Sequence, residues 1–154
     1  MTIEEKITSL GLVLPPPPAP AGSYVPSVRT GNLLFIAGTL PMVDGKLAYT
    51  GMIGSAPEKD IDYGYAAAKA CALAALANAK AALGSLDKIK RVVNVNGFVN
   101  APAGFEMAPK VINGASDVLV EIFGEAGKHA RAAVALPGVP LNATAEVQVI
   151  LEVE

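Results

Sequence analysis

The chain has 154 residues, 52% apolar and 17% charged, with 12 Lys and Arg against 14 Asp and Glu, one His, one Cys and no Trp. This length fits one domain with its own core, and the apolar fraction excludes a disordered chain. A net charge of −2 provides no basic patch, so neither nucleic acid nor an anionic membrane is an expected partner. One cysteine and one histidine are a poor basis for a metal site, and we expect no cofactor.

The N-terminus carries acidic residues where a signal peptide needs positive charge, and no stretch reaches the roughly 18 uncharged apolar residues of a membrane span. The expected location is therefore cytoplasmic. A chain this apolar has few polar residues to cover its surface, which favours a homo-oligomer.

Residues 1–21 are expected to form a short helix at about Ile3–Leu10 followed by a proline-rich linker, and residues 22–154 one domain. The run Pro15–Pro18 favours polyproline II, a stiff spacer, although an SH3-like domain also binds such runs. Two strands, Ser23–Arg29 and Leu33–Ala37, flank a turn and predict an antiparallel hairpin.

A loop from Pro41 to Gly54 precedes a long helix, which the capping-box spacing of Ser55 and Glu58 starts and Gly84 ends. Lys90–Asn100 is expected to be a strand with Val93, Val95 and Val99 on one face. A second helix from Pro109 to Gly124 and two strands, Ala130–Leu136 and Thr144–Val153, complete the chain. This order predicts an α+β layer with both helices on one sheet face.

Alternation along the last two strands assigns side chains to the two sheet faces. In the last strand Glu146 and Gln148 point away from the helices. In the strand before it, we expect Ala132, Val134 and Leu136 on the helix face, and Arg131, Ala133 and Ala135 on the open face. A partner subunit covering that open face would leave Arg131 and Glu146 in a shared crevice.

Several segments together resemble the Rid family of reactive intermediate deaminases, also called YjgF or L-PSP, which has a chorismate-mutase-like trimeric fold. The interval of fifteen residues from Arg131 to Glu146, with a Leu/Pro turn between them, is the most specific part. The matching segments are Gly22–Val25, Leu34–Pro41, Val95–Val99, Ala130–Val134 and Val139–Val147.

The resemblance implies hydrolysis of 2-imino or 2-enamino acids to 2-oxo acids and ammonia, in sites between the subunits of a homotrimer. It implies that Arg131 binds the substrate carboxylate and that Glu146 positions the attacking water. An arginine fork matches a carboxylate bidentately, and a glutamate can orient water and accept its proton. The implied pocket also includes Tyr24, Gly38 and the neighbouring Thr39.

Two further residues are candidates for binding substrate. Asn113 lies where family members often have a pocket asparagine, or it begins a turn of the helix. His129 precedes Arg131 by two residues and would share its strand face, or it is structural. Alternatively, Arg131 and Glu146 form a structural ion pair with each other. Tyr24 is alternatively a buried aromatic residue of a subunit interface.

The sequence also departs from the family pattern. Ala37-Gly38-Thr39 replaces a Ser-Gly-Gln stretch, and Ala132-Ala133 replaces a Ser/Cys pair, which marks a divergent subgroup of about 150 residues. The changed pocket residues Ala37-Gly38-Thr39 favour an alternative function: a non-catalytic sensor of small carboxylates on the same trimeric scaffold. An endoribonuclease, an old label of the family, does not suit an acidic chain of pI about 5.4 with few aromatics.

Overall fold

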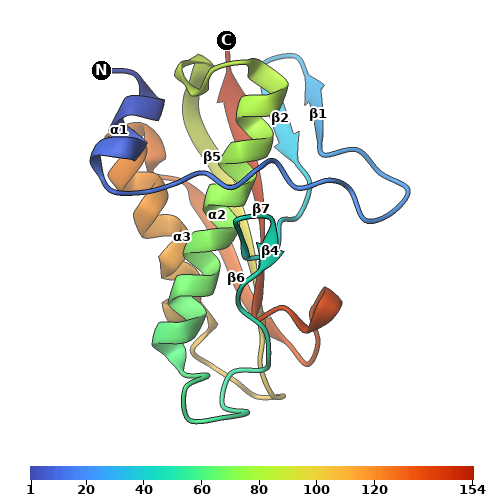
Figure 1. Ribbon diagram of the computed structural model, residues 1–154. Helices are drawn as coiled ribbons and strands as arrows, with labels where there is room; N and C mark the ends of the chain where they lie inside the picture. The colour runs from blue at the N-terminus through green and yellow to red at the C-terminus, as the bar shows by residue number, and fades with distance from the viewer.

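A mixed five-stranded sheet carries two long helices on one face in the computed structural model, which describes residues 1–154 (Figure 1). The strand order is β1-β2-β7-β5-β6, and every neighbouring pair is antiparallel except β5 and β6. Parallel neighbours need a crossover, which helix α3 supplies between them. The strands are β1 (Ser27–Thr30), β2 (Leu33–Ile36), β5 (Ile89–Asn100), β6 (Ala130–Leu136) and β7 (Ala145–Val153).

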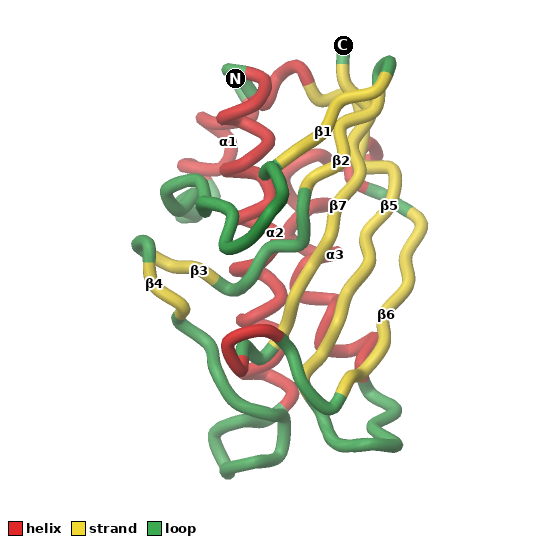
Figure 2. The backbone as a smooth tube through the Cα atoms, turned by 90° about the vertical axis from the view of Figure 1, so that its right-hand side faces the viewer, coloured by secondary structure: helices red, strands yellow, loops and turns green.

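Both long helices, α2 (Ile61–Leu83) and α3 (Ala108–Phe123), pack side by side behind the sheet, and the other sheet face is open (Figure 2). The α+β layer with its helices on one face is therefore confirmed. Most of the fourteen buried residues of α2 are alanines. Their small side chains let this helix pack close to the sheet. It is long and apolar enough to cross a membrane, but 72% of its most apolar window is buried inside this fold.

The start of α2 differs from the sequence expectation. Its N-cap is Asp60, whose carboxylate accepts a 2.9 Å hydrogen bond from Tyr63 N–H. The hydroxyl of Ser55 instead donates to the Met52 carbonyl in a turn before the helix, so the capping box predicted at Ser55 is wrong. At the other end, Gly84 adopts the left-handed φ of 83° that closes the helix, as predicted.

Smaller elements fix the edges of the fold. Helix α1 (Ile3–Ser9) buries Ile7 in the core, and Glu4 of this helix accepts a 2.8 Å hydrogen bond from Leu86 N–H in the turn η1 (Leu86–Lys88). A short hairpin, β3 (Met42–Val43) with β4 (Lys46–Leu47), follows β2. Two further 3-10 turns are η2 (Gly124–Gly127) and η3 (Pro140–Asn142).

The valine alternation predicts the wrong face for one residue of β5. Val92, Val95 and Val99 are fully buried, whereas Val93 is only half-buried. The pairing of β5 with β7 shifts register between Val92 and Asn94, and such a bulge adds a residue to the alternation. The period-2 pattern therefore holds only beyond the bulge.

The face assignment of β6 is also wrong. Arg131 pairs with the fully buried Val95 and points toward α3, together with Ala133 and Ala135. Val134 and Leu136 instead lie on the open face, 45% and 41% exposed. The reason is that α3 packs close over β6 and leaves room for alanine, so the larger apolar side chains of this edge strand take the open side.

Candidate active site

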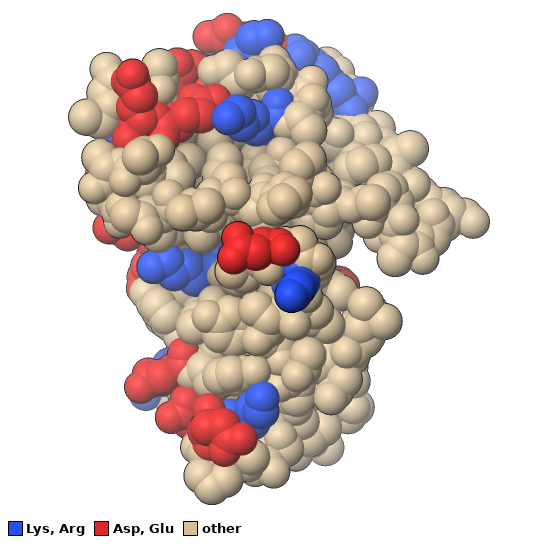
Figure 3. All heavy atoms as spheres, in the orientation of Figure 1, with Lys and Arg blue, Asp and Glu red and all other residues tan.

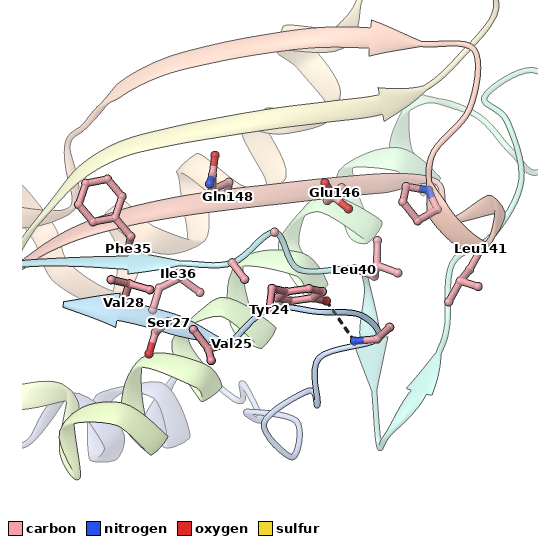
Figure 4. Close-up of a pocket in the computed structure, with 14 residues that line it drawn as sticks. Tyr24, Val25, Ser27, Val28, Phe35, Ile36, Leu40, Leu141, Glu146 and Gln148 are labelled. Carbon is pink, nitrogen blue, oxygen red and sulfur yellow. Dashed lines mark hydrogen bonds between the residues drawn. The ribbon is translucent and has the colours of Figure 1, made fainter. Parts of the chain in front are cut away.

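A cavity of about 810 Å³ opens on the sheet face that lacks helices, between the β1–β2 hairpin, the turn η3 and the start of β7 (Figure 4). We call it the main cavity. Its polar side chains are those of Tyr24, Ser27, Glu146 and Gln148, and its remaining lining is apolar or backbone: Ala21, Val25, Val28, Phe35, Ile36, Ala37, Gly38, Leu40, Pro140 and Leu141. The main cavity thus holds one carboxylate in largely apolar surroundings.

Glu146 projects from β7 into this cavity. Its carboxylate accepts no hydrogen bond from the chain, and burial raises its pKa above the ordinary value of 4.5. A Cβ built on Gly38 would lie 2.9 Å from Oε2 of Glu146, so only glycine leaves the carboxylate its present position. A half-buried carboxylate with a raised pKa and free lone pairs is suited to accept a proton from water.

Tyr24 approaches the same space from the segment before β1 (Figure 4). Its hydroxyl oxygen accepts a 3.2 Å hydrogen bond from Ala21 N–H, which leaves the hydroxyl proton free to donate to a ligand. Half of the tyrosine surface is exposed. The structure thus brings Tyr24, Gly38 and Glu146 together in the lining of the main cavity.

Thr39 has a different role from the one expected of it. Its backbone pairs with Val147 of β7 through two hydrogen bonds of 2.8 and 3.0 Å. Its hydroxyl lies in the core, shared between the carbonyls of Cys71 at 2.8 Å and Val147 at 3.1 Å. Thr39 therefore holds the Gly38 segment against β7 and offers no hydroxyl to the main cavity.

Arg131 lies at the edge strand β6, on the helix side of the sheet. Its Nη1 donates to Oδ1 of Asn113 at 2.8 Å and to Oγ of Ser116 at 3.1 Å, and its Nη2 donates to the Pro109 carbonyl at 3.4 Å. All three acceptors belong to α3. A hollow of about 350 Å³ adjoins this edge, with Pro109 and Ala133 in its lining.

His129 acts on Arg131 through Ser116. The Nδ1 atom of His129 lies 2.6 Å from the Gly127 carbonyl and its Nε2 lies 2.8 Å from Oγ of Ser116. A carbonyl only accepts, so Nδ1 carries a proton, and in the neutral ring Nε2 then accepts from the serine hydroxyl. The serine lone pairs are then directed at Arg131. His129 is thus a support of the arginine cluster rather than a member of the main cavity.

The protomer therefore contains two separate groups of candidate residues. Tyr24, Gly38 and Glu146 line the main cavity on the open face. Arg131, its partner Asn113 and the supporting His129 lie on the helix side of β6. Arg131 and Glu146 form no ion pair within one chain. No three His, Cys, Asp or Glu side chains come close enough together to bind one metal ion.

Sequence reasoning missed two site residues. Ser116 follows Asn113 by three positions and so shares its helix face, a spacing that points to a common contact. Gln148 follows Glu146 by two positions on the same strand face and lines the same cavity. Both signals are present in the sequence.

Comparison with known proteins gives the family. The family model described as "YjgF/chorismate_mutase-like, putative endoribonuclease" matches residues 4–153. The chain belongs to this YjgF family. The resemblance stated from the sequence is thus confirmed, and with it the chorismate-mutase-like α+β fold with a mixed sheet.

Individual YjgF relatives span nearly the whole chain. Protein TCP17 of Trypanosoma cruzi is 41% identical over 151 residues, 97% of this chain and 93% of that protein. A crystal structure from Shewanella oneidensis, described as a putative endoribonuclease, is 37% identical with a TM-score of 0.93, covering 99% of this chain and 100% of that one. RidA from an Antarctic Psychrobacter is 26% identical with a TM-score of 0.60, covering 88% and 93% of the two chains.

Proposed function

We propose that the protein hydrolyses small 2-imino and 2-enamino acids to 2-oxo acids and ammonia. The observation that carries the proposal is the pair of complementary half-sites. In the first half-site, three acceptors of α3 orient the guanidinium of Arg131. In the second, the half-buried carboxylate of Glu146 accepts no hydrogen bond from the chain and lies in a largely apolar cavity. A carboxylate-bearing electrophile that needs one activated water fits this combination.

The two half-sites lie on opposite faces of one sheet, so a ligand that contacts both must lie between two protomers. We propose a homotrimer in which Arg131 of one protomer faces Glu146 of the next. Exposed apolar side chains on the open face support a covering partner, because a monomer seldom leaves such a set in water. They are Val28, Phe35, Val134 and Leu136.

In the proposed reaction, Arg131 holds the substrate carboxylate by two parallel hydrogen bonds. The carbon of a protonated imine is already electrophilic, so the water oxygen attacks C2 while the C=N electron pair moves to nitrogen. Glu146 takes one proton from that water and passes it to the amine. The C2–N bond then breaks and its electron pair leaves with ammonia. The remaining hydroxyl gives its proton to Glu146, which passes it to the ammonia, and the carbonyl forms. Protonated imine plus water thus gives 2-oxo acid plus ammonium.

Several observations favour this reaction over RNA cleavage. No lysine or arginine lines the main cavity, and the net charge of the chain is −2. On the face shown in Figure 3, basic and acidic side chains are interspersed, and the chain between Lys6 and Arg29 carries no charge. RNA binding relies on a basic groove and stacking aromatics.

The experiment is to generate 2-aminoacrylate with a serine dehydratase and to follow pyruvate with and without the protein. Faster pyruvate release, together with a trimeric mass by light scattering, is the expected result. Binding of a small 2-oxo acid without any acceleration would favour the sensor. A monomer that accelerates the reaction would contradict the shared site.

A further inference from the structure

A second cavity of about 330 Å³ lies under the proline-rich segment Pro16–Ala21, which crosses over α2 between α1 and β1 (blue in Figure 1). We call it the strap chamber. The chamber adjoins the main cavity, because six residues line both: Ala21, Tyr24, Ala37, Gly38, Leu40 and Leu141. Its volume equals the liquid share of roughly eleven water molecules.

Asn78 of α2 is the one amide side chain in the chamber lining. Only 5% of its surface is exposed, and its side chain forms no hydrogen bond with the chain. No fully buried side-chain nitrogen or oxygen lacks a partner, so the unbonded amide atoms of Asn78 are reached by solvent. A buried amide has two donors and two acceptor positions, and leaving them unpaired is costly. An amide in a cavity lining whose partners come from solvent marks a position where a ligand can replace that water.

The rest of the lining restricts the chemistry of that ligand. No charged side chain lines the chamber. Proline has no N–H, so Pro16, Pro17, Pro18 and Pro20 contribute carbonyl acceptors and no donors. Thr39 is the other buried polar residue in the lining, and its hydroxyl donates to the backbone carbonyls of Cys71 and Val147. The chamber thus favours a neutral group that donates and accepts, and it disfavours a carboxylate, which only accepts.

We infer that the strap chamber is a subsite for the far end of the substrate and selects 2-imino acids whose side chain ends in an uncharged carboxamide. The carboxamide oxygen accepts from Nδ2 of Asn78, and its NH₂ group donates to Oδ1 of Asn78 or to the proline-segment carbonyls. This inference rests on the proposed function for the reacting end of the molecule. It goes beyond it by naming the substrate class.

The test compares three imines generated in place by an amino-acid oxidase from glutamine, from glutamate and from the apolar isostere 2-amino-5-methylhexanoate. The wild-type protein is expected to prefer the glutamine imine over both others by about tenfold in kcat/KM. Asn78→Leu and Asn78→Ser are expected to remove the preference over the isostere. The same leucine change at exposed Asn32, in the β1–β2 turn, is expected to retain it.

Failure of this inference is separable from failure of the proposed function. Equal hydrolysis of the glutamine imine and its isostere by the wild-type protein, or a preference that survives in both folded Asn78 variants, would overturn the subsite and leave the deaminase standing. If no imine is hydrolysed, calorimetry with 2-oxoglutaramate decides. The subsite is still supported if the wild-type protein binds 2-oxoglutaramate about tenfold more tightly than 2-oxoglutarate and Asn78→Ser loses this preference. Equal binding of the two ligands by the wild-type protein overturns it.

Discussion

Nη1 of Arg131 in β6 donates a 2.8 Å hydrogen bond to Oδ1 of Asn113 in α3. Helix α3 therefore fixes the orientation of the guanidinium group. Ser116 and the Pro109 carbonyl complete the set of acceptors. Because these contacts are planar and directional, they suit an arginine and not a lysine. These contacts use both N–H groups of Nη1 and one of Nη2, so Nε–H and the other N–H of Nη2 remain to donate to a ligand carboxylate.

The first prediction concerns Arg131 itself. Arg131→Lys is expected to keep the fold and the charge but to lose the bidentate geometry, lowering kcat/KM by about one to two decades, because a bond to a charged group contributes roughly 1.5–3 kcal/mol. Arg131→Ala is expected to lower it further. Imine hydrolysis and Tm measure both effects, and Arg91→Lys, at an exposed position of β5, is the control. Full activity in a trimeric Arg131→Lys protein would contradict the assignment.

The second prediction concerns the support of that arginine. His129→Leu removes the acceptor that orients the Ser116 hydroxyl, and we expect KM to rise about three- to tenfold with kcat nearly unchanged. His129→Gln can present an amide oxygen to Ser116 and is expected to restore part of the KM. If both variants lower Tm equally and leave KM unchanged, His129 is structural only.

Much of the fold follows from the sequence because its signals are local. The valine alternation of β7, the alanine stripe of α2 and Gly84 each depend on residues within one element. The two wrong assignments depend on tertiary context. The bulge that replaces Val93 by Val92 in the core arises from pairing with β7, and the side of β6 that faces α3 depends on how closely that helix packs.

The site residues were predictable in type and not in arrangement. Arg131 and Glu146 stand out by the fifteen-residue interval, but the strand alternation placed them on one face, and the structure separates them. Asn78 carried no sequence signal because an asparagine among alanines is compatible with any half-buried helix position. Its place in a cavity lining depends on the proline-rich segment Pro16–Ala21, about sixty residues away, which lines the same cavity.

The third prediction tests the close approach between Gly38 and Glu146. Gly38→Ala adds a Cβ 2.9 Å from Oε2, and the flexible carboxylate, rather than the backbone, must move. A misplacement of about an ångström costs up to a hundredfold in rate, so we expect kcat to fall about 10- to 100-fold with little change in Tm. Gly138→Ala, where an added Cβ meets nothing within 4 Å, is the matched control and is expected to retain activity. Equal activity of the two variants would remove Glu146 from the reaction.

The fourth prediction concerns the charge of Glu146. Burial raises its pKa, so the folded chain binds this proton more tightly than the unfolded chain, and stability declines as pH rises from about 4.5 through the raised pKa. Glu146→Gln removes this loss. We expect its Tm at neutral pH to equal or exceed that of the wild-type protein, with the difference vanishing below pH 4.5, while kcat falls at least about a hundredfold for want of a base.

Thermal melts from pH 4 to pH 8 and imine hydrolysis at neutral pH measure both effects on the same protein. The opposite signs matter, because a residue that only supports the structure loses stability and activity together. A direct ion pair between Glu146 and Arg131 of a neighbouring protomer would lower the pKa and make Glu146→Gln less stable at neutral pH. In the proposed site the substrate lies between these two residues, so we expect the first pattern. Loss of stability with retained kcat would assign Glu146 to the interface alone.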